Sequence, residues 1–127
     1  MKYFCICLGI LLGLVFTAHN VYASEDSVVI RIISADTIIV DKGEPVRLLG
    51  VLAPGENDYY YQEGKDYLSS LLLGQEVELN DDNNNSLIGN RDVFGRHLAY
   101  VYRIKDKRFI NVVLIQQGYC FYFIKPF

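Results

Sequence analysis

The chain has 127 residues, of which 51% are apolar and 21% are charged, a balance that suits one small globular domain and excludes a disordered chain or a string of domains. Its formal net charge is -3, and it becomes -4 without the first 23 residues, because Lys2 is the only Lys, Arg, Asp or Glu among them. This acidic balance excludes a general attraction to nucleic acid or to anionic membranes, so any phosphate binding has to be local.

The N-terminus has the pattern of a secretory signal peptide. Lys2 precedes an uninterrupted run of apolar and small residues from Tyr3 to Ala18, and Ala23 is the small residue that a signal peptidase requires. An uncleaved anchor is the alternative, but the run is shorter than the ~20 residues of a spanning helix. We therefore predict a signal peptide at 1–23 and a secreted or periplasmic domain at 24–127, with no stable membrane association after cleavage.

The first half of the mature chain predicts strands. Ser27 to Ile33 and Thr37 to Val40 are rich in β-branched residues and predict two strands. Asp41 to Gly43 predicts a hairpin turn, because Gly43 can adopt the positive φ that such a turn requires. Val46 to Leu52 then predicts a third strand.

The second half predicts two helices and two strands. Apolar residues recur every three or four positions from Tyr60 to Leu73, which is typical of an amphipathic helix, and Gly74 ends it. Glu76 to Leu79 and His97 to Arg103 predict strands, and Ile110 to Gln117 predicts a short helix. Three strands, a helix, two strands and a helix predict a mainly β domain with helices, namely an OB-fold with a five-stranded barrel.

Two features leave alternatives open on the residues alone. Arg47 interrupts an otherwise apolar strand, where it could bind phosphate through its paired donors or form an ion pair on the exposed face of the sheet. The run Tyr59-Tyr60-Tyr61 could stack on nucleic-acid bases or pack as one face of a helix.

Five motifs resemble the staphylococcal nuclease (thermonuclease) family in their order and spacing: RIISADTIIV, VRLLGVLAPGE, EGKDYLSSLLLGQEVEL, RDVFGRHLAYVY and INVVLIQQGY. The resemblance implies an OB-fold and a secreted enzyme that hydrolyses phosphodiester bonds of DNA and RNA with calcium. Members usually continue into a further C-terminal helix that packs on the barrel, which this sequence lacks. Its absence would leave apolar surface for self-association.

The resemblance also implies roles for individual residues. Asp36 and Thr37 match the turn that holds calcium, Arg47 and Arg96 match the arginines that contact the phosphate, and Tyr122 lies near the position of a nucleotide-stacking aromatic residue. Glu56 is the first carboxylate of the loop after the third strand, and it could serve as a displaced general base.

The same loop departs from the family pattern. Leu52 replaces a metal-binding carboxylate, and Gly55 replaces the glutamate that activates water. Calcium binding is therefore expected to be weak or absent.

The sequence supports three hypotheses. In the first, an exported domain binds nucleic acid or a nucleotide phosphate in a pocket, and its nuclease activity is weak or lost. In the second, it is an active calcium-dependent endonuclease with Glu56 as base. In the third, it is a protein-interaction module that uses the barrel as a scaffold.

Overall fold

The computed structural model describes residues 25–82 and 90–124. The signal peptide predicted at residues 1–23 lies outside these ranges, so both the signal and export stay predictions. No helix within the described residues is long and apolar enough to cross a membrane.

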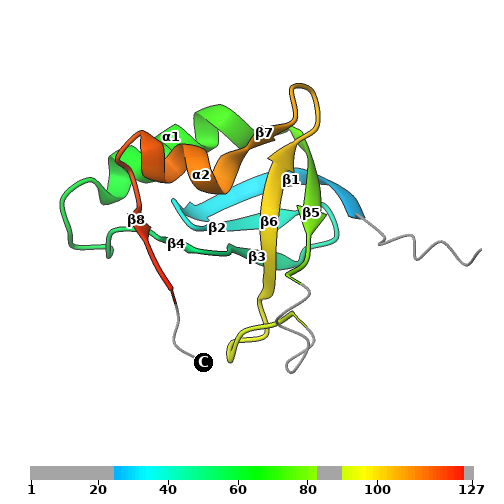
Figure 1. Ribbon diagram of the computed structural model, residues 1–127, viewed down its shortest axis with the longest axis horizontal. Coiled ribbons are helices and arrows are strands. Elements are labelled where there is room, and N and C mark those ends of the chain that lie inside the picture. Colours follow the sequence, from blue (N-terminus) through cyan, green and yellow to red (C-terminus); the bar gives the residue numbers. More distant parts are fainter. Residues whose placement is uncertain (1–24, 83–89, 125–127) are drawn as a thin grey trace, which may run out of the picture.

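A closed five-stranded barrel forms the body of the domain (Figure 1). Its strands are β1 (Glu25–Ser34), β2 (Thr37–Val40), β3 (Pro45–Leu48), β5 (Glu76–Asn80) and β6 (His97–Arg103). They pair in the order β3-β2-β1-β5-β6, and a parallel pairing between β3 and β6 closes the ring. The predicted OB-fold is therefore confirmed.

Three further strands have only two residues each. They are β4 (Val51–Leu52), β7 (Arg108–Phe109) and β8 (Phe121–Tyr122). β7 extends the barrel sheet beside β6, and β4 and β8 form a separate two-stranded sheet. The predicted strand from Val46 to Leu52 is divided into β3 and β4, because Gly50 has φ 73°, a left-handed conformation that breaks an extended chain. β4 then pairs with β8, so that the C-terminal segment lies beside the chain that follows β3.

Two helices lie over one end of the barrel, α1 (Tyr61–Leu72) and α2 (Ile110–Gln116) (Figure 1). α1 buries Gly64, Leu68, Leu71 and Leu72 against the barrel, which agrees with the period of the sequence. Gly64 allows a tight contact, because a Cβ there would lie only 3.1 Å from the Cβ of Ala35. This close approach places the start of α1 beside the turn between β1 and β2.

Asn111 joins α2 to the barrel. This buried side chain accepts a hydrogen bond from the backbone N–H of Val101 at 2.8 Å and donates to the carbonyl oxygen of Leu49 at 2.8 Å. Because Leu49 directly follows β3, the contact fixes β3 relative to β6. A buried amide thereby positions β3, which contains Arg47, against β6, which directly follows Arg96.

The described C-terminal residues present apolar side chains to solvent. Phe121, Tyr122, Phe123 and Ile124 are 65%, 69%, 40% and 67% exposed. The backbone N–H of Phe123 donates to the carbonyl oxygen of Gly50 at 3.0 Å, which holds this segment against the chain before β4. These exposed side chains offer a surface for the predicted self-association, and the self-association itself stays a prediction.

Candidate phosphate-binding site

Arg47 lies on the outer face of β3, between two residues that point into the core. Val46 and Leu48 are buried, so the alternation of the strand turns Arg47 to the opposite side. Its side chain is only 13% exposed, and its Nη2 lies 3.3 Å from Oδ2 of Asp36. Nη1 donates to the carbonyl oxygen of Leu48 at 2.6 Å. The arginine inside an apolar strand therefore forms a largely buried ion pair.

Asp36 occupies the turn between β1 and β2, and four neighbours hold its carboxylate. Oδ1 accepts hydrogen bonds from the hydroxyls of Ser34 at 2.8 Å and Thr37 at 2.9 Å. Oδ2 accepts one from the backbone N–H of Ala53 at 2.8 Å and faces Arg47. The carboxylate thereby ties the turn to the chain that follows β4.

Arg96 lies in a second turn, which Asp92 organises. Oδ1 of Asp92 accepts the backbone N–H groups of Phe94 and Arg96, both at 2.9 Å, and Oδ2 accepts Nε of Arg96 at 2.6 Å. Gly95, at φ 77°, makes the left-handed bend that closes the turn. Burial on its own raises the pKa of Asp92, but the hydrogen bonds from Arg96 outweigh it and hold that pKa below its usual value.

Thr37 connects the two arginines. Nη1 of Arg96 donates to its hydroxyl at 3.4 Å, and the same hydroxyl donates to Asp36, which faces Arg47. Burial lowers the pKa of Arg47, Asp36 opposes that effect, and Arg96 adds to it as a nearby like charge. The structure therefore brings together Asp36, Thr37, Arg47 and Arg96, from two turns and two strands.

The arrangement can bind an anion at Arg47 and Arg96. A guanidinium carries five N–H donors in a planar fork that matches the oxygens of a phosphate. The Arg96 side chain is 29% exposed, so part of its fork faces solvent, and its Cζ lies 5.3 Å from the centroid of the Phe94 ring. Each arginine already faces one carboxylate, so an entering phosphate competes with Asp36 and Asp92.

The residues around Asp36 do not fit a calcium ion. Calcium takes about six to eight oxygen ligands, most of them from carboxylates and carbonyls. Both oxygens of Asp36 are already engaged, one of them by a guanidinium, and Leu52 beside it offers no oxygen in its side chain. Across residues 25–82 and 90–124, no group of three or more His, Cys, Asp or Glu is arranged to hold a metal.

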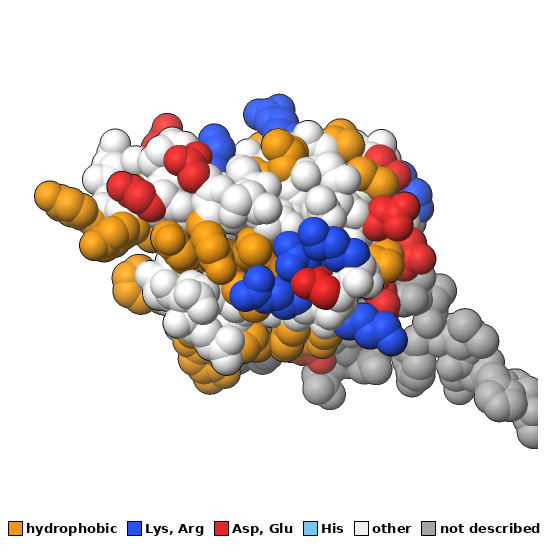
Figure 2. All heavy atoms as spheres, turned by 90° about the horizontal axis from the view of Figure 1, so that it is seen from above, with side chains coloured by type: hydrophobic (Ala, Val, Ile, Leu, Met, Phe, Trp, Pro, Cys, Tyr) orange, Lys and Arg blue, Asp and Glu red, His pale blue; other side chains and the backbone are white. Residues whose placement is uncertain are grey.

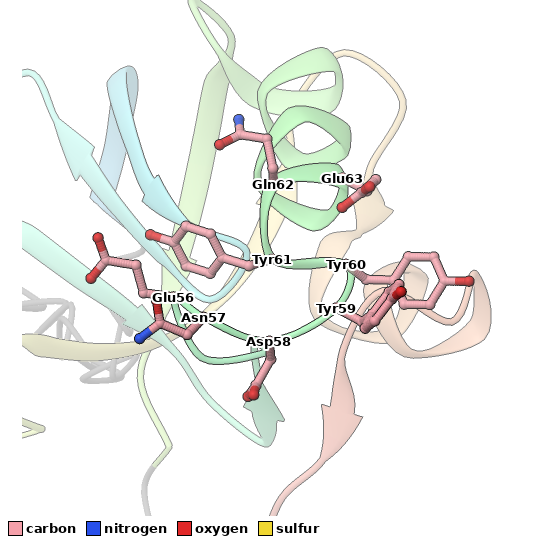
Figure 3. Close-up of a pocket in the computed structure, with 8 residues that line it drawn as sticks. All are labelled: Glu56, Asn57, Asp58, Tyr59, Tyr60, Tyr61, Gln62 and Glu63. Carbon is pink, nitrogen blue, oxygen red and sulfur yellow. The ribbon is translucent and has the colours of Figure 1, made fainter.

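Glu56 lies outside this cluster. It follows Gly55, whose carbonyl oxygen accepts the backbone N–H of Asp58 at 2.8 Å and whose own N–H donates to the Asp58 carboxylate at 2.9 Å. Figure 3 shows the Glu56 side chain leaving this closed turn on the same side as Tyr61. Glu56 is exposed, and within the described residues it makes no hydrogen bond or ion pair.

Tyr122 lies on β8, opposite Val51 of β4. Its electrostatic influence reaches Tyr100 of β6, whose pKa is raised chiefly by burial and, to a smaller extent, by Tyr122. Among the described residues, no hydrogen bond or ring contact joins Tyr122 to Arg47 or Arg96. The stacking role of Tyr122 stays a prediction.

Comparison with known proteins identifies the family. The family described as "Staphylococcal nuclease homologue" matches residues 45–126. The chain belongs to this family. A curated relative, the "Thermonuclease" of Staphylococcus hyicus, is 34% identical over 99 residues, which cover 71% of this chain and 54% of the relative. The chain thus spans about half the length of that staphylococcal nuclease homologue.

Two contributors in this family member were missed by the sequence reasoning. Ser34 was not assigned to the site, yet its hydroxyl donates to Asp36. Asp92 was not assigned to the site, yet it pairs with Arg96. The signal for Asp92 was present in the run Asp92 to Arg96, because an aspartate followed three positions later by a glycine is typical of a turn in which the carboxylate accepts backbone N–H groups.

Proposed function

We propose that this nuclease homologue binds a phosphate group of nucleic acid between Arg47 and Arg96, and hydrolyses phosphodiester bonds weakly or not at all. The single observation that carries the binding proposal is the hydrogen-bonded chain from Arg96 through Thr37 and Asp36 to Arg47. It places one guanidinium group from β3 and one from the turn before β6 around one polar centre. Such a pair can neutralise the charge of a phosphate group.

Weak hydrolysis is expected because the loop beside the arginines lacks a positioned general base. A positioned general base contributes about 10²- to 10⁴-fold to the rate of such a reaction. Gly55 has no side chain to supply one, and Glu56 projects from a turn that the Gly55–Asp58 hydrogen bonds close. The neighbouring Leu52 adds no charge to the site. Binding without efficient turnover is the outcome that these residues favour.

Affinity for a short oligonucleotide tests the binding proposal. A 5′-phosphorylated oligothymidylate carrying a fluorescent label should bind the protein, as measured by fluorescence anisotropy at low salt. Arg96→Ala should weaken binding about tenfold, because a hydrogen bond to a charged group contributes about 1.5–3 kcal/mol. Arg31→Ala is the matched control, since Arg31 is an exposed β1 arginine that belongs to neither pair. Equal losses for both variants would show only general charge attraction.

The active-enzyme hypothesis keeps one supporting observation. Gly55 gives the loop backbone freedom, so Glu56 could move inward once the hydrogen bonds to Asp58 break. Digestion of labelled single-stranded DNA, with calcium and with a chelator, decides between the two hypotheses. Rapid calcium-dependent digestion that Glu56→Gln abolishes would replace the weak-nuclease proposal.

Export is part of the proposal and rests on residues 1–23 alone. Expression of the full chain in a bacterium with a secretion pathway should yield a mature protein that begins at Ser24, as N-terminal sequencing would show. An intact N-terminus on a membrane-bound protein would favour the anchor. Recovery of an uncleaved protein in the cytoplasm would reject both.

A further inference from the structure

Two tyrosines before α1 are left unburied by the fold. Tyr59 is 91% exposed and Tyr60 is 60% exposed, although aromatic rings usually contribute large buried areas. α1 begins only at Tyr61, whose hydroxyl donates to the carbonyl oxygen of Ile33 at 3.4 Å. Packing on a helix face, one of the two roles left open by the sequence, is therefore wrong for Tyr59 and Tyr60.

The backbone turns these two rings outward as a pair. Tyr60 has φ 64°, in the left-handed region where a bulky residue is rarely found. The ring centroids of Tyr59 and Tyr60 lie 6.2 Å apart, with their planes inclined at 58°. Within the described residues, no Lys or Arg lies over either ring. The pair therefore forms an open wedge whose ring faces remain available.

The charge around the wedge has a single sign. The tyrosines line an open hollow of about 560 Å³, together with Glu56, Asp58 and Glu63, and no Lys or Arg contributes to its lining. Figure 3 shows Tyr59, Tyr60 and Glu63 on one side of this segment, and Glu56 and Tyr61 on the other. In the part of the chain that the structure describes, Glu63 makes no ion pair or side-chain hydrogen bond.

We propose that Tyr59, Tyr60 and Glu63 bind a Lys or Arg side chain from a basic segment of another protein. A cation within about 6 Å of an aromatic centroid is attracted to the face of the ring, and the Glu63 carboxylate supplies the opposite charge. The complementarity of charge decides against base stacking. A nucleic acid strand stacked on these rings would bring its phosphates near the Glu63 carboxylate, which repels them, and no Lys or Arg lines the hollow to attract them.

This surface is separate from the arginine site and does not depend on the proposed phosphate binding. Tyr59 and Tyr60 lie on the loop between β4 and α1 and Glu63 lies in the first turn of α1, whereas Arg47 lies on β3 and Arg96 lies before β6. A basic partner could therefore dock while a phosphate occupies the arginines.

A titration of the full chain with a blocked tri-arginine peptide tests the proposal. Nuclear magnetic resonance signals of Tyr59, Tyr60 and Glu63 should shift saturably at millimolar peptide, and less so at high salt. Tyr59→Ala and Glu63→Gln should each weaken binding about two- to fivefold. The matched controls are Phe121→Ala and Glu76→Gln, which remove an exposed ring and an exposed carboxylate elsewhere. Unchanged thermal melting of all four variants would show that folding is unaffected.

Three results would overturn the proposal. The first is the absence of saturable shifts at these residues, and the second is equal weakening by the control variants. The third is occupation by a different partner. Oligothymidylate that shifts Tyr59 and Tyr60 more strongly than the peptide does would identify a base-stacking surface instead.

A second copy of this chain could also occupy the surface formed by Tyr59, Tyr60 and Glu63, and the experiment must distinguish it from a foreign partner. The turn between β6 and β7 carries exposed Lys105 and Lys107, and exposed Arg108 begins β7. Figure 2 shows that Lys and Arg side chains gather around an acidic one on the face seen there. Sedimentation of the protein without peptide would reveal such pairing. If the protein associates with itself, and both Tyr59→Ala and Lys107→Ala abolish this association, the surface binds a second copy of the chain and the proposal of a foreign basic partner is wrong.

Discussion

Arg47 and Asp36 neutralise each other across the boundary between β3 and the β1–β2 turn, with Nη2 and Oδ2 3.3 Å apart and both side chains almost buried. The pair joins β3, which carries Arg47, to the β1–β2 turn, and Thr37 directly after that turn accepts the hydrogen bond from Arg96. Folding stability depends on both charges, because removing either group leaves the other one buried without an opposite charge.

Breaking this pair should destabilise the protein. Arg47→Met keeps the length of the apolar stem and leaves the Asp36 carboxylate uncompensated, so the free energy of unfolding should fall by about 3 kcal/mol. Urea unfolding measures the loss. Adding Asp36→Asn should restore part of it, because the neutral amide no longer needs a cation. A double variant that is less stable than Arg47→Met would contradict a direct coupling between the two residues.

Acid should weaken the turn that Asp92 organises. The pKa of Asp92 is lowered in the folded protein, so this carboxylate stabilises the fold at a pH above its unfolded pKa of about 3.9. That contribution is lost as the pH falls through the lower, folded value. The difference in unfolding free energy between the natural protein and Asp92→Asn, measured by urea unfolding, should therefore shrink below about pH 4. A difference that is constant from pH 7 to pH 3 would show that the Asp92 charge is unimportant.

Two substitutions should rebuild hydrolysis. Leu52→Asp adds a carboxylate beside Asp36, and Gly55→Glu adds a base, so the double variant should digest single-stranded DNA faster than the natural protein by at least the ~10² that a positioned base supplies. A Cβ at Gly55 would lie 2.9 Å from Oδ2 of Asp58, so the Asp58 side chain must move. Asp58→Ala is therefore included as a background in which this contact is absent.

The same assay examines Glu56. If it is a solvated loop acid, Glu56→Gln should leave the slow digestion by the natural protein unchanged. A specific loss of activity on this substitution would identify Glu56 as the base, because glutamine keeps the size and polarity of the side chain while removing its basicity.

Cys120 should be unreactive in the folded protein. Burial raises the pKa of its thiol to about 12, and its Sγ lies 3.6 Å from the carbonyl oxygen of Ala35. Alkylation requires the thiolate, so iodoacetamide at pH 8 should label Cys120 only when the protein unfolds. Mass spectrometry of peptides from native and urea-treated protein locates the label. Rapid labelling of the native state would show that β8 opens readily.

The exposed C-terminal segment should promote self-association. Phe121, Phe123 and Ile124 present apolar surface next to the short β4–β8 pairing. Sedimentation velocity over a range of concentrations should reveal a dimer that Phe121→Ser combined with Ile124→Ser weakens. A monomer at all concentrations would reject this surface as an interface.

The sequence by itself determined the barrel and most of its boundaries. The strand at His97 to Arg103 was predicted at its observed limits, because a short apolar run rich in aromatic and β-branched residues is typical of a strand. α1 was predicted to within one residue at each end, because its apolar residues recur every three or four positions and Gly74 follows it. The break between β3 and β4 was not predicted, since Gly50 can occupy either an extended or a left-handed conformation and only the pairing of β4 with β8 selects the second.

Only the tertiary structure decided which charged groups of the site face one another. The residue types at Asp36, Arg47 and Arg96 were visible in the sequence, but whether their charges face a ligand or each other depends on strand register. Pairing of Thr37 with Arg47 across β2 and β3 brings the guanidinium within reach of Asp36. The parallel pairing of β3 with β6, which closes the barrel, brings Arg96 to Thr37, although 59 positions separate them in the chain. Electrostatic energy depends on distances between such groups, and a linear sequence does not contain those distances.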